Sequence, residues 1–176
     1  METARLIIRN WQDADFLAFY RLNNDPNVME FFPKRLDEQE AFEKFHQIRE
    51  NNEKTSFVIY ALEDKASGRL IGLCGLQEVH LIPIIPAGKI EIAWRILPEF
   101  QRRGFAFEAA QHIMNDGFQR LAVNEIIAFT AAVNLPSLGL MQKLGMRELL
   151  EKRFIHPKVP DNHAHLKPHR IFAVHK

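Results

Sequence analysis

The sequence lacks most of the features that mark secreted, membrane or nucleic-acid-binding proteins. Its single cysteine, Cys74, excludes an internal disulfide and favours a reducing compartment such as the cytoplasm. No apolar run approaches the ~20 residues that span a bilayer, and the N-terminal residues lack the apolar core of a signal peptide. Lys and Arg total 23 against 22 Asp and Glu, without a block of like charges, for a formal net charge of +1. We therefore expect neither a membrane nor nucleic acid as a partner.

What remains is the composition of an ordinary globular chain. Its 176 residues are 47% hydrophobic and 26% charged, which suits a folded chain with a real core. Neither a repeat nor a low-complexity tract interrupts it. We expect one domain over residues 1–176, as a monomer or a homodimer, because composition does not separate these two states.

Hydrophobic periodicity predicts an α+β (mixed α/β) chain. Asp37 is the residue type that caps a helix N-terminus, and 63–68 has the composition of a hairpin turn. A second hairpin is expected through Pro83, Pro86, Ala87 and Gly88. Strands are predicted at 4–9, 56–62, 69–79, 90–97, 125–130, 147–155 and 170–175, and helices at 12–22, 36–52, 105–120 and 137–144. Antiparallel strands followed by a strand-helix-strand-helix unit indicate a mixed sheet.

A glycine-containing loop between a strand and a helix predicts an anion site. Residues 101–106 read Gln-Arg-Arg-Gly-Phe-Ala and open the predicted helix. The first amides of a helix have no intrahelical acceptor, so a phosphate can accept their hydrogen bonds. Gly104 lets the backbone approach the ligand, and Arg102 and Arg103 add positive charge. Neither the three-glycine dinucleotide pattern nor a Gly-Lys-Ser/Thr loop is present, so a different diphosphate ligand is indicated.

The pattern Gln-x-x-Gly-x-Ala after Leu97-Pro98-Glu99-Phe100 resembles the acyl-CoA pyrophosphate loop of the GNAT N-acetyltransferase superfamily. The segment 91–99 looks like its central strand. About thirty residues after the loop comes Asn134-Leu135-Pro136-Ser137, and residues 143–146 close the segment that begins there. Asn24-Asp25-Pro26-Asn27-Val28 resembles the branch that acetylates the N-terminal alanine or serine of ribosomal proteins. The resemblance covers about residues 4–150. It implies the GNAT fold, a mostly antiparallel twisted sheet of six to seven strands flanked by about four helices.

The resemblance implies acetyl-CoA as co-substrate and no metal. By analogy the loop after Gln101 holds the pyrophosphate, the end of the central strand binds the pantetheine like an added strand, and Asn134 contacts the pantetheine. The loop has a plainer interpretation as an ordinary strand-to-helix turn with surface arginines. The implied cofactor-binding residues are Trp94, Arg95, Ile96, Gln101, Arg102, Arg103, Gly104, Phe105, Ala106 and Asn134.

The general acid is less clearly indicated than the donor site. Asn134 and Ser137 are both residue types that cap helices. In the ribosomal branch the matching serine can protonate the departing thiolate, whereas many GNAT members place a tyrosine seven residues after the asparagine. That position is Met141 here, which has no proton to donate. The acid is therefore Ser137 or water.

A base is needed because only a neutral amine attacks. At pH 7 an α-amine with a pKa near 7.8 is about 14 per cent neutral, against less than ~0.1 per cent for a lysine, so an α-amine is the easier acceptor. Glu91, at the start of the central strand, is the candidate base, directly or through a water, with Glu78 a weaker one. A strand amide near Arg95 or Ile96 would stabilise the developing oxyanion. The alternative for Glu91 is a solvated strand-end carboxylate.

Other conspicuous residues favour structural roles. Trp11 and 31–33, which reads Phe-Phe-Pro, could wall an acceptor pocket, but aromatic residues are more often core. His163, His165 and His169 are compatible with a metal site, yet without a partner ligand a surface histidine-rich loop is favoured. Cys74 has no base near it in sequence, which favours a buried structural thiol.

These observations predict an acetyl-CoA-dependent N-acetyltransferase that works by direct attack in a ternary complex. The favoured acceptor is a protein N-terminal α-amine, followed by a small-molecule amine such as an amino acid, a polyamine or an antibiotic. A catalytically weak acyl-CoA-binding sensor, suggested by Met141, and an interaction protein that keeps only the fold are alternatives. The acceptor is determined by pocket shape, which the sequence does not specify.

Overall fold

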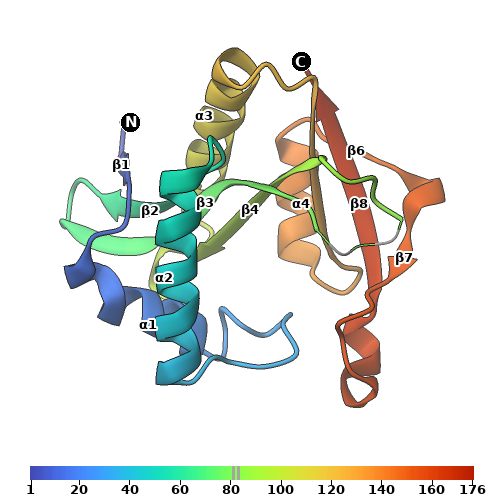
Figure 1. Ribbon diagram of the computed structural model, residues 1–176, viewed down its shortest axis with the longest axis horizontal. Coiled ribbons are helices and arrows are strands. Elements are labelled where there is room, and N and C mark those ends of the chain that lie inside the picture. Colours follow the sequence, from blue (N-terminus) through green and yellow to red (C-terminus); the bar gives the residue numbers. More distant parts are fainter. Residues whose placement is uncertain (81, 83) are drawn as a thin grey trace.

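The computed structural model describes residues 1–176 except Leu81 and Pro83. One sheet has the strand order β1-β2-β3-β4-β5-β8-β6, with β7 paired to β8 (Figure 1). Among the described residues only β4 and β5 pair in parallel, which confirms the mixed, mostly antiparallel sheet. The strands are β1 (Leu6–Arg9), β2 (Ile59–Asp64), β3 (Arg69–Glu78), β4 (Ile90–Ile96), β5 (Glu125–Ala131), β6 (Arg147–Glu148), β7 (Phe154–Ile155) and β8 (Pro168–His175).

In the part of the chain that the structure describes, the sheet has eight strands where six to seven were expected. The segment 147–155, predicted as one strand, contains the 3-10 turn Leu150–Lys152, which divides it into β6 and β7. Both short strands pair with β8, which contains the strand predicted at 170–175. The predicted β3–β4 hairpin is also present, although Pro83 of its turn lies outside the described residues.

Four α-helices flank the sheet: α1 (Phe16–Asn24), α2 (Glu38–Lys54), α3 (Phe105–Arg120) and α4 (Leu135–Lys143). Figure 1 looks onto the face that carries α1 and α2, and α3 lies behind the sheet. Gly117 of α3 packs within 2.6 Å of Leu76, measured from the position a Cβ would take. Asp37 caps α2 as predicted, accepting a hydrogen bond of 2.9 Å from Glu40 N. Within the part of the chain that the structure describes, none of the helices is long and apolar enough to cross a membrane.

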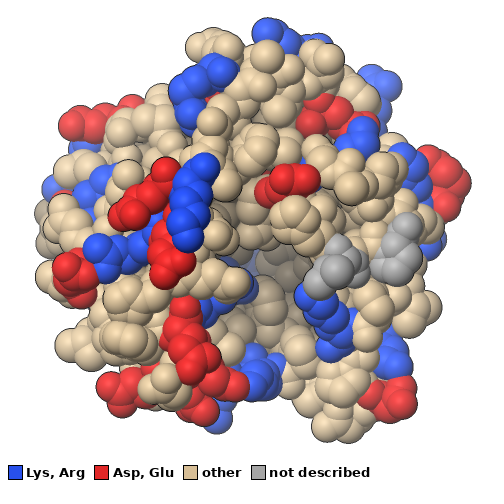
Figure 2. All heavy atoms as spheres, viewed as in Figure 1, with Lys and Arg blue, Asp and Glu red and all other residues tan. Residues whose placement is uncertain are grey.

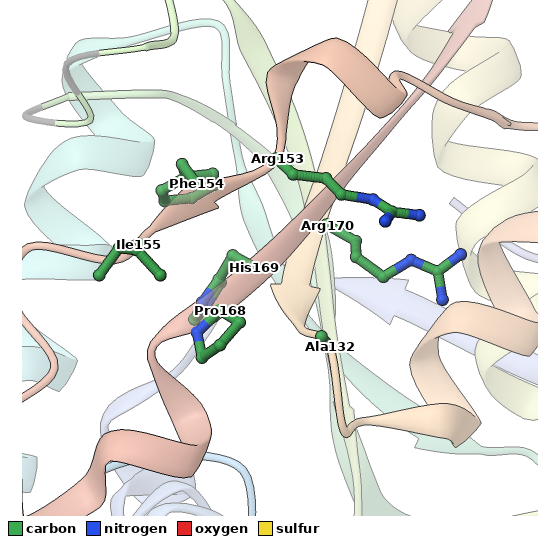
Figure 3. Close-up of a pocket in the computed structure, with 7 residues that line it drawn as sticks. All are labelled: Ala132, Arg153, Phe154, Ile155, Pro168, His169 and Arg170. Carbon is green, nitrogen blue, oxygen red and sulfur yellow. The ribbon is translucent and has the colours of Figure 1, made fainter.

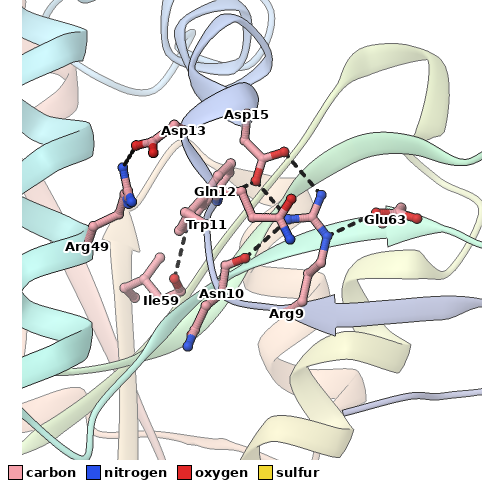
Figure 4. Close-up of polar contacts among 9 residues, drawn as sticks. All are labelled: Arg9, Asn10, Trp11, Gln12, Asp13, Asp15, Arg49, Ile59 and Glu63. Atoms are coloured by element: carbon pink, nitrogen blue, oxygen red, sulfur yellow. Dashed lines mark hydrogen bonds and ion pairs between the residues drawn. The ribbon is translucent and has the colours of Figure 1, made fainter.

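A polar network ties the start of α1 to the sheet (Figure 4). Arg9 of β1 donates two hydrogen bonds, of 2.7 and 3.1 Å, to the buried carboxylate of Asp15 and one of 3.0 Å to Glu63 of β2. The Trp11 indole donates to Ile59 O at 3.0 Å, and its side chain is 5% exposed. Trp11 is therefore core, as the plainer interpretation predicted, and does not wall a pocket.

The parallel pair β4–β5 is short and positions the site. Only Ile90↔Ile126 and Glu91↔Ile127 are paired before the two strands diverge. β4 continues to Ile96 beside β3, whereas β5 stays paired with β8 to its end. The divergence leaves a V-shaped opening in the middle of the sheet, with Glu91 at its apex.

Candidate active site

The loop before α3 presents backbone N–H groups that have no acceptor in the described part of the chain. These are the amides of residues 102–107, and the next amide, Glu108 N, donates to Gly104 O at 3.0 Å. Arg102 (φ 57°) and Gly104 (φ 84°) both adopt the left-handed conformation. Successive amides around such residues form a concave anion-binding nest, here continued by the N-terminus of α3. The geometry fits a diphosphate.

Two side chains hold this loop in place. Gln101 donates from Nε2 to Ile96 O at 2.8 Å, which ties the loop to the end of β4. Arg5 donates from Nη1 to Arg103 O at 2.8 Å and from Nε to Glu108 Oε2 at 2.7 Å. Gln101 was expected at this site, but Arg5 was missed because it lies almost a hundred residues away in sequence and belongs to no local motif.

The free edge of β4 offers main-chain groups to the V-shaped opening. Leu97 N donates to Ile71 O and Val79 N donates to Lys89 O, both at 2.8 Å, so alternate residues of β4 turn their main chain toward β3. That alternation directs the amides of Trp94 and Ile96 and the carbonyl of Trp94 into the opening, while the carbonyl of Ile96 accepts from Gln101. The main chain of Arg95 faces β3 instead, so the structure differs from the expected role of Arg95 main-chain groups in cofactor binding.

Glu91 is buried at the apex of the opening. Its side chain accepts a 3.0 Å hydrogen bond from Gln77 Nε2, and the residue is 9% exposed. Burial raises the pKa of its carboxyl to about 7, opposed by the Gln77 hydrogen bond and the charge of Arg95. A solvated strand-end carboxylate does not describe this environment. Glu78 is exposed and pairs with Ile90, which places it on the opposite face of the sheet.

Asn134 and Ser137 lie at the start of α4. Asn134 Oδ1 accepts from Ser137 N at 3.2 Å, and Nδ2 donates to Thr130 Oγ1 at 2.9 Å, so Asn134 caps the helix. Because of this cap, α4 begins at Leu135 rather than at Ser137. The Ser137 hydroxyl is half-buried and has no partner within the described chain. Met141 is 2% exposed and belongs to the core, so position 141 supplies no proton donor to the site.

A hollow lies on the α1/α2 face of the sheet, opposite α3. Figure 2 shows it at the centre of the molecule, with Lys and Arg side chains on its floor and rim and Asp and Glu side chains along the left and lower-left part of the rim. Arg95 points to this face, donates from Nη1 to Asn23 Oδ1 at 2.6 Å and lies 4.4 Å from the centroid of the Phe32 ring. Phe32 therefore lies beside Arg95 at the site, whereas Phe31 packs in the small apolar cluster of Ala131, Val159 and Leu166.

A separate cavity of about 530 Å³ lies in the C-terminal part (Figure 3). Its two arginines both pair with Glu148, so neither is free to bind an anion. None of the residues expected to bind acyl-CoA lines it. The lining residues are Ala132, Arg153, Phe154, Ile155, Pro168, His169 and Arg170.

The histidines expected in one loop are divided between two places. His163 and His165 lie in the 3-10 segment Asp161–Leu166, whereas His169 belongs to β8 and packs 4.7 Å from His156, centroid to centroid. Burial lowers the pKa of His169 to about 4. The described residues contain no group of three or more His, Cys, Asp or Glu side chains arranged to hold a metal ion. Cys74 is fully buried, which raises the pKa of its thiol well above the ordinary value, as expected of a structural cysteine.

Comparison with known proteins gives the family of the chain. Residues 5–147 match the model of the acetyltransferase (GNAT) domain. The chain is 32% identical over 145 residues to an uncharacterized N-acetyltransferase, YnaD, of Bacillus subtilis, covering 82% of this chain and 81% of that protein. The chain therefore belongs to the GNAT family and is an N-acetyltransferase, as predicted. Acetyl-CoA is the acetyl donor of this family.

Solved structures share the fold at lower identity. The spermidine N-acetyltransferase of Vibrio cholerae, in complex with CoA and spermine, superposes with a TM-score of 0.76 at 20% identity, covering 98% of this chain and 96% of that one. A putative ribosomal-protein-serine acetyltransferase of Vibrio cholerae gives a TM-score of 0.77 at 16% identity, covering 99% and 96%. The two differ in the acceptors named for them, so their likeness to this chain establishes the fold and leaves the acceptor open.

Proposed function

We propose that the whole chain, residues 1–176, acts as one cytoplasmic acetyltransferase domain that moves an acetyl group from acetyl-CoA to a primary amine by direct attack in a ternary complex. One observation carries this proposal: Glu91, a carboxyl with a pKa of about 7, lies at the last paired position before β4 and β5 diverge. A base with a pKa near the working pH can accept a proton from an ammonium group and release it to water. Glu91 takes this role.

The residues present fit acetyl-CoA. Free amides at 102–107 suit its pyrophosphate, and the free edge at Trp94 and Ile96 suits a pantetheine arm lying along β4 as an added strand. Bound there, acetyl-CoA supplies an activated acyl group at the opening. The amide of Trp94 faces the opening and is the donor proposed to stabilise the oxyanion, with the edge of Ile96 beside it.

The acid remains Ser137 or water. Ser137 is favoured because its hydroxyl has no partner within the described chain and because Asn134 fixes the first turn of α4 around it. Asn134 uses its side chain as a cap, so its proposed contact with the pantetheine is through the remaining amide hydrogen or the main chain. The buried Met141 supports the alternative of a sensor with weak catalysis, which turnover would reject.

The favoured acceptor is a protein N-terminal α-amine, because a larger fraction of such an amine is neutral at pH 7. A similar fold in the putative ribosomal-protein-serine acetyltransferase supports this choice, while the spermidine N-acetyltransferase supports a small-molecule amine as the second candidate. On this face of the sheet Arg95 presents a cation beside Asn23 and Phe32, which weighs against a polyamine.

The test is acetyl-CoA binding followed by turnover. A ligand that binds only the folded chain raises its melting temperature, by an amount equivalent to ~2.7 kcal/mol at a hundred times Kd. We expect such a shift with acetyl-CoA and release of free CoA with at least one of four acceptor classes: N-terminal peptides, amino acids, polyamines and aminoglycosides. No thermal shift at millimolar acetyl-CoA would contradict the proposal, and binding without turnover would indicate the sensor.

A further inference from the structure

We propose that the acceptor carries a carboxylate in addition to its amine, and that Arg95 is the residue that binds this carboxylate. The inference rests on the proposed function, because it takes the hollow beside Glu91 as the acceptor side of an acetyltransferase. It goes further by naming the chemical class of the acceptor and the side chain that selects it.

Arg95 forms no ion pair among the described residues, although its charge interacts with that of Glu91 on the same face of β4. It is half-buried, and within the described chain no carboxylate lies within 4 Å of its guanidinium. Its recorded neighbours are the Asn23 side-chain oxygen at 2.6 Å and the face of Phe32. Buried charges in proteins are normally paired. One N–H group donates to Asn23, and the others remain available for the two-pronged recognition of a carboxylate.

Two lysines add positive charge on the side of Arg95, Lys44 beside Arg95 and Lys158 beside Lys44. The pKa of Lys44, on α2, lies below the ordinary lysine value because its ammonium is partly desolvated and faces the charges of Arg95 and Lys158. Partial burial, and after it the charge of Lys158, lowers the pKa of His156. The acidic side chains of α2 nearest to Lys44 are engaged elsewhere, because Glu40 binds Lys34 and Glu43 accepts from Gln39. Lys44 therefore adds positive charge near Arg95.

The spacing of Glu91 and Arg95 limits where the carboxylate lies on the acceptor. The two residues share a face of β4 and are four positions apart, which is about 13 Å between Cα atoms at ~3.3 Å per residue. Long side chains shorten the separation between their charged groups, and the charge of each group acts on the pKa of the other. An N-terminal peptide with an acidic side chain at its second or third residue fits, as does an ω-amino acid.

Two matched series of acceptors test the proposal. The first series consists of three peptides with amidated C-termini that differ in one side chain: Ala-Glu-Ala, Ala-Gln-Ala and Ala-Lys-Ala. The second consists of three small amines that differ in one end group: 5-aminopentanoate, pentylamine and 1,5-diaminopentane. We expect kcat/KM to fall from acidic to neutral to basic in at least one series, by about tenfold or more per step, as for loss of a charge-assisted hydrogen bond. The series whose members the enzyme acetylates shows whether the acceptor is a peptide or a small molecule.

Variants of Arg95 and Lys44 then distinguish a role in acceptor recognition from a purely structural role. In Arg95→Gln we expect the preference for the acidic acceptor to disappear through a higher KM, with acetyl-CoA affinity unchanged, and we expect Arg95→Lys to restore part of it. Lys44→Gln should weaken the preference, whereas Lys54→Gln, at the far end of the same helix, should not. Added salt should raise KM for the acidic acceptor alone.

The acceptor assignment is overturned if wild-type protein binds acetyl-CoA and turns over acidic and neutral acceptors equally well, or prefers the basic one. It is also overturned if Arg95→Gln slows all three acceptors by the same factor, since that is the result of a purely structural role. Failure of the proposed function looks different, because acetyl-CoA then gives neither a thermal shift nor turnover with any acceptor.

Discussion

Glu91 carries a carboxyl whose neighbours act on its pKa in opposite directions. Burial raises the pKa to about 7, while the Gln77 hydrogen bond and the charge of Arg95 oppose the rise. The outcome is a group that is partly protonated at neutral pH. Such a group changes its protonation state with little free energy, which a general base must do twice in each catalytic cycle.

Replacing this carboxyl should remove the base and leave the donor site intact. In Glu91→Gln we expect kcat/KM to fall about 10²- to 10⁴-fold, the usual contribution of general base catalysis, while the thermal shift with acetyl-CoA is unchanged. The matched control is Glu78→Gln on the neighbouring strand, which is exposed on the opposite face and should be neutral. A fully active Glu91→Gln variant would show that water or another group accepts the proton.

The pH profile should report the pKa of Glu91. Only the deprotonated carboxylate accepts a proton, so kcat/KM should rise with pH through about 7. The Gln77 N–H stabilises the charged form, so in Gln77→Leu the pKa of Glu91 rises and the acidic limb moves to higher pH. The acceptor amine titrates identically in both enzymes, and any difference between the two profiles therefore belongs to the enzyme. An unmoved limb would assign the titration to the amine.

The loop before α3 is the element most sensitive to a small change. Gly104 has a φ of 84°, and a Cβ there would lie 3.3 Å from Arg5 Nη2, the side chain that holds the loop. Such a substitution strains the backbone and displaces amides that face the proposed pyrophosphate.

We expect Gly104→Ala to raise the Kd of acetyl-CoA about tenfold or more, measured by calorimetry. Gly68→Ala is the control, because Gly68 also has a positive φ, 65°, in the β2–β3 turn but no atom within 4 Å of its Cβ position. Both variants should lose about 1–3 kcal/mol of stability to backbone strain, and only Gly104→Ala should lose affinity. Equal affinities in the two variants would contradict the placement of the pyrophosphate.

The elements that the sequence predicts well are those with strong local signals. The bounds of α3 and the Asp37 cap of α2 follow from hydrophobic period and cap chemistry, and both match the structure. The division of 147–155 into β6 and β7 was not predictable, because the break at Leu150–Lys152 carries no glycine or proline. Its position depends on pairing with β8 rather than on local preference.

The residues of the candidate site likewise fall into those with a local sequence signal and those without one. Glu91 and the loop 101–106 belong to contiguous motifs, so their place in the sequence was informative. Arg5, Gln77 and Lys44 contribute through contacts between distant segments, and no local pattern of residues signals them. The direction of Arg95 was missed for a related reason: which residues of β4 face β3 depends on register, and one residue of slip reverses every assignment.

Across the chain as a whole, β8 connects three other strands. It pairs with β5 on one side and with β6 and β7 on the other. Its Ile171 is 1% exposed in the second apolar cluster, together with Ile127 beside Glu91. The β5 side of the V-shaped opening is therefore supported by β8.

Ile171→Ala should lower the free energy of unfolding by about 2–5 kcal/mol, the cost of truncating a buried isoleucine. Ile155→Ala provides the comparison, since Ile155 of β7 is 64% exposed and its truncation should change stability by less than ~0.5 kcal/mol. Denaturant titration of both variants measures the difference. Similar losses in the two variants would show that β8 is not the support described.

The position of β8 also has a consequence for the order in which the molecule assembles on the ribosome. Residues 168–175 emerge after all the other strands, yet they fill a place inside the sheet. Until then β5 has an unpaired edge, and the apolar side chains of the second cluster remain in water. Nascent chains that stall after about residue 131 would expose a strand edge of the kind that pairs with other chains, so chaperone demand and aggregation should be greatest at that length.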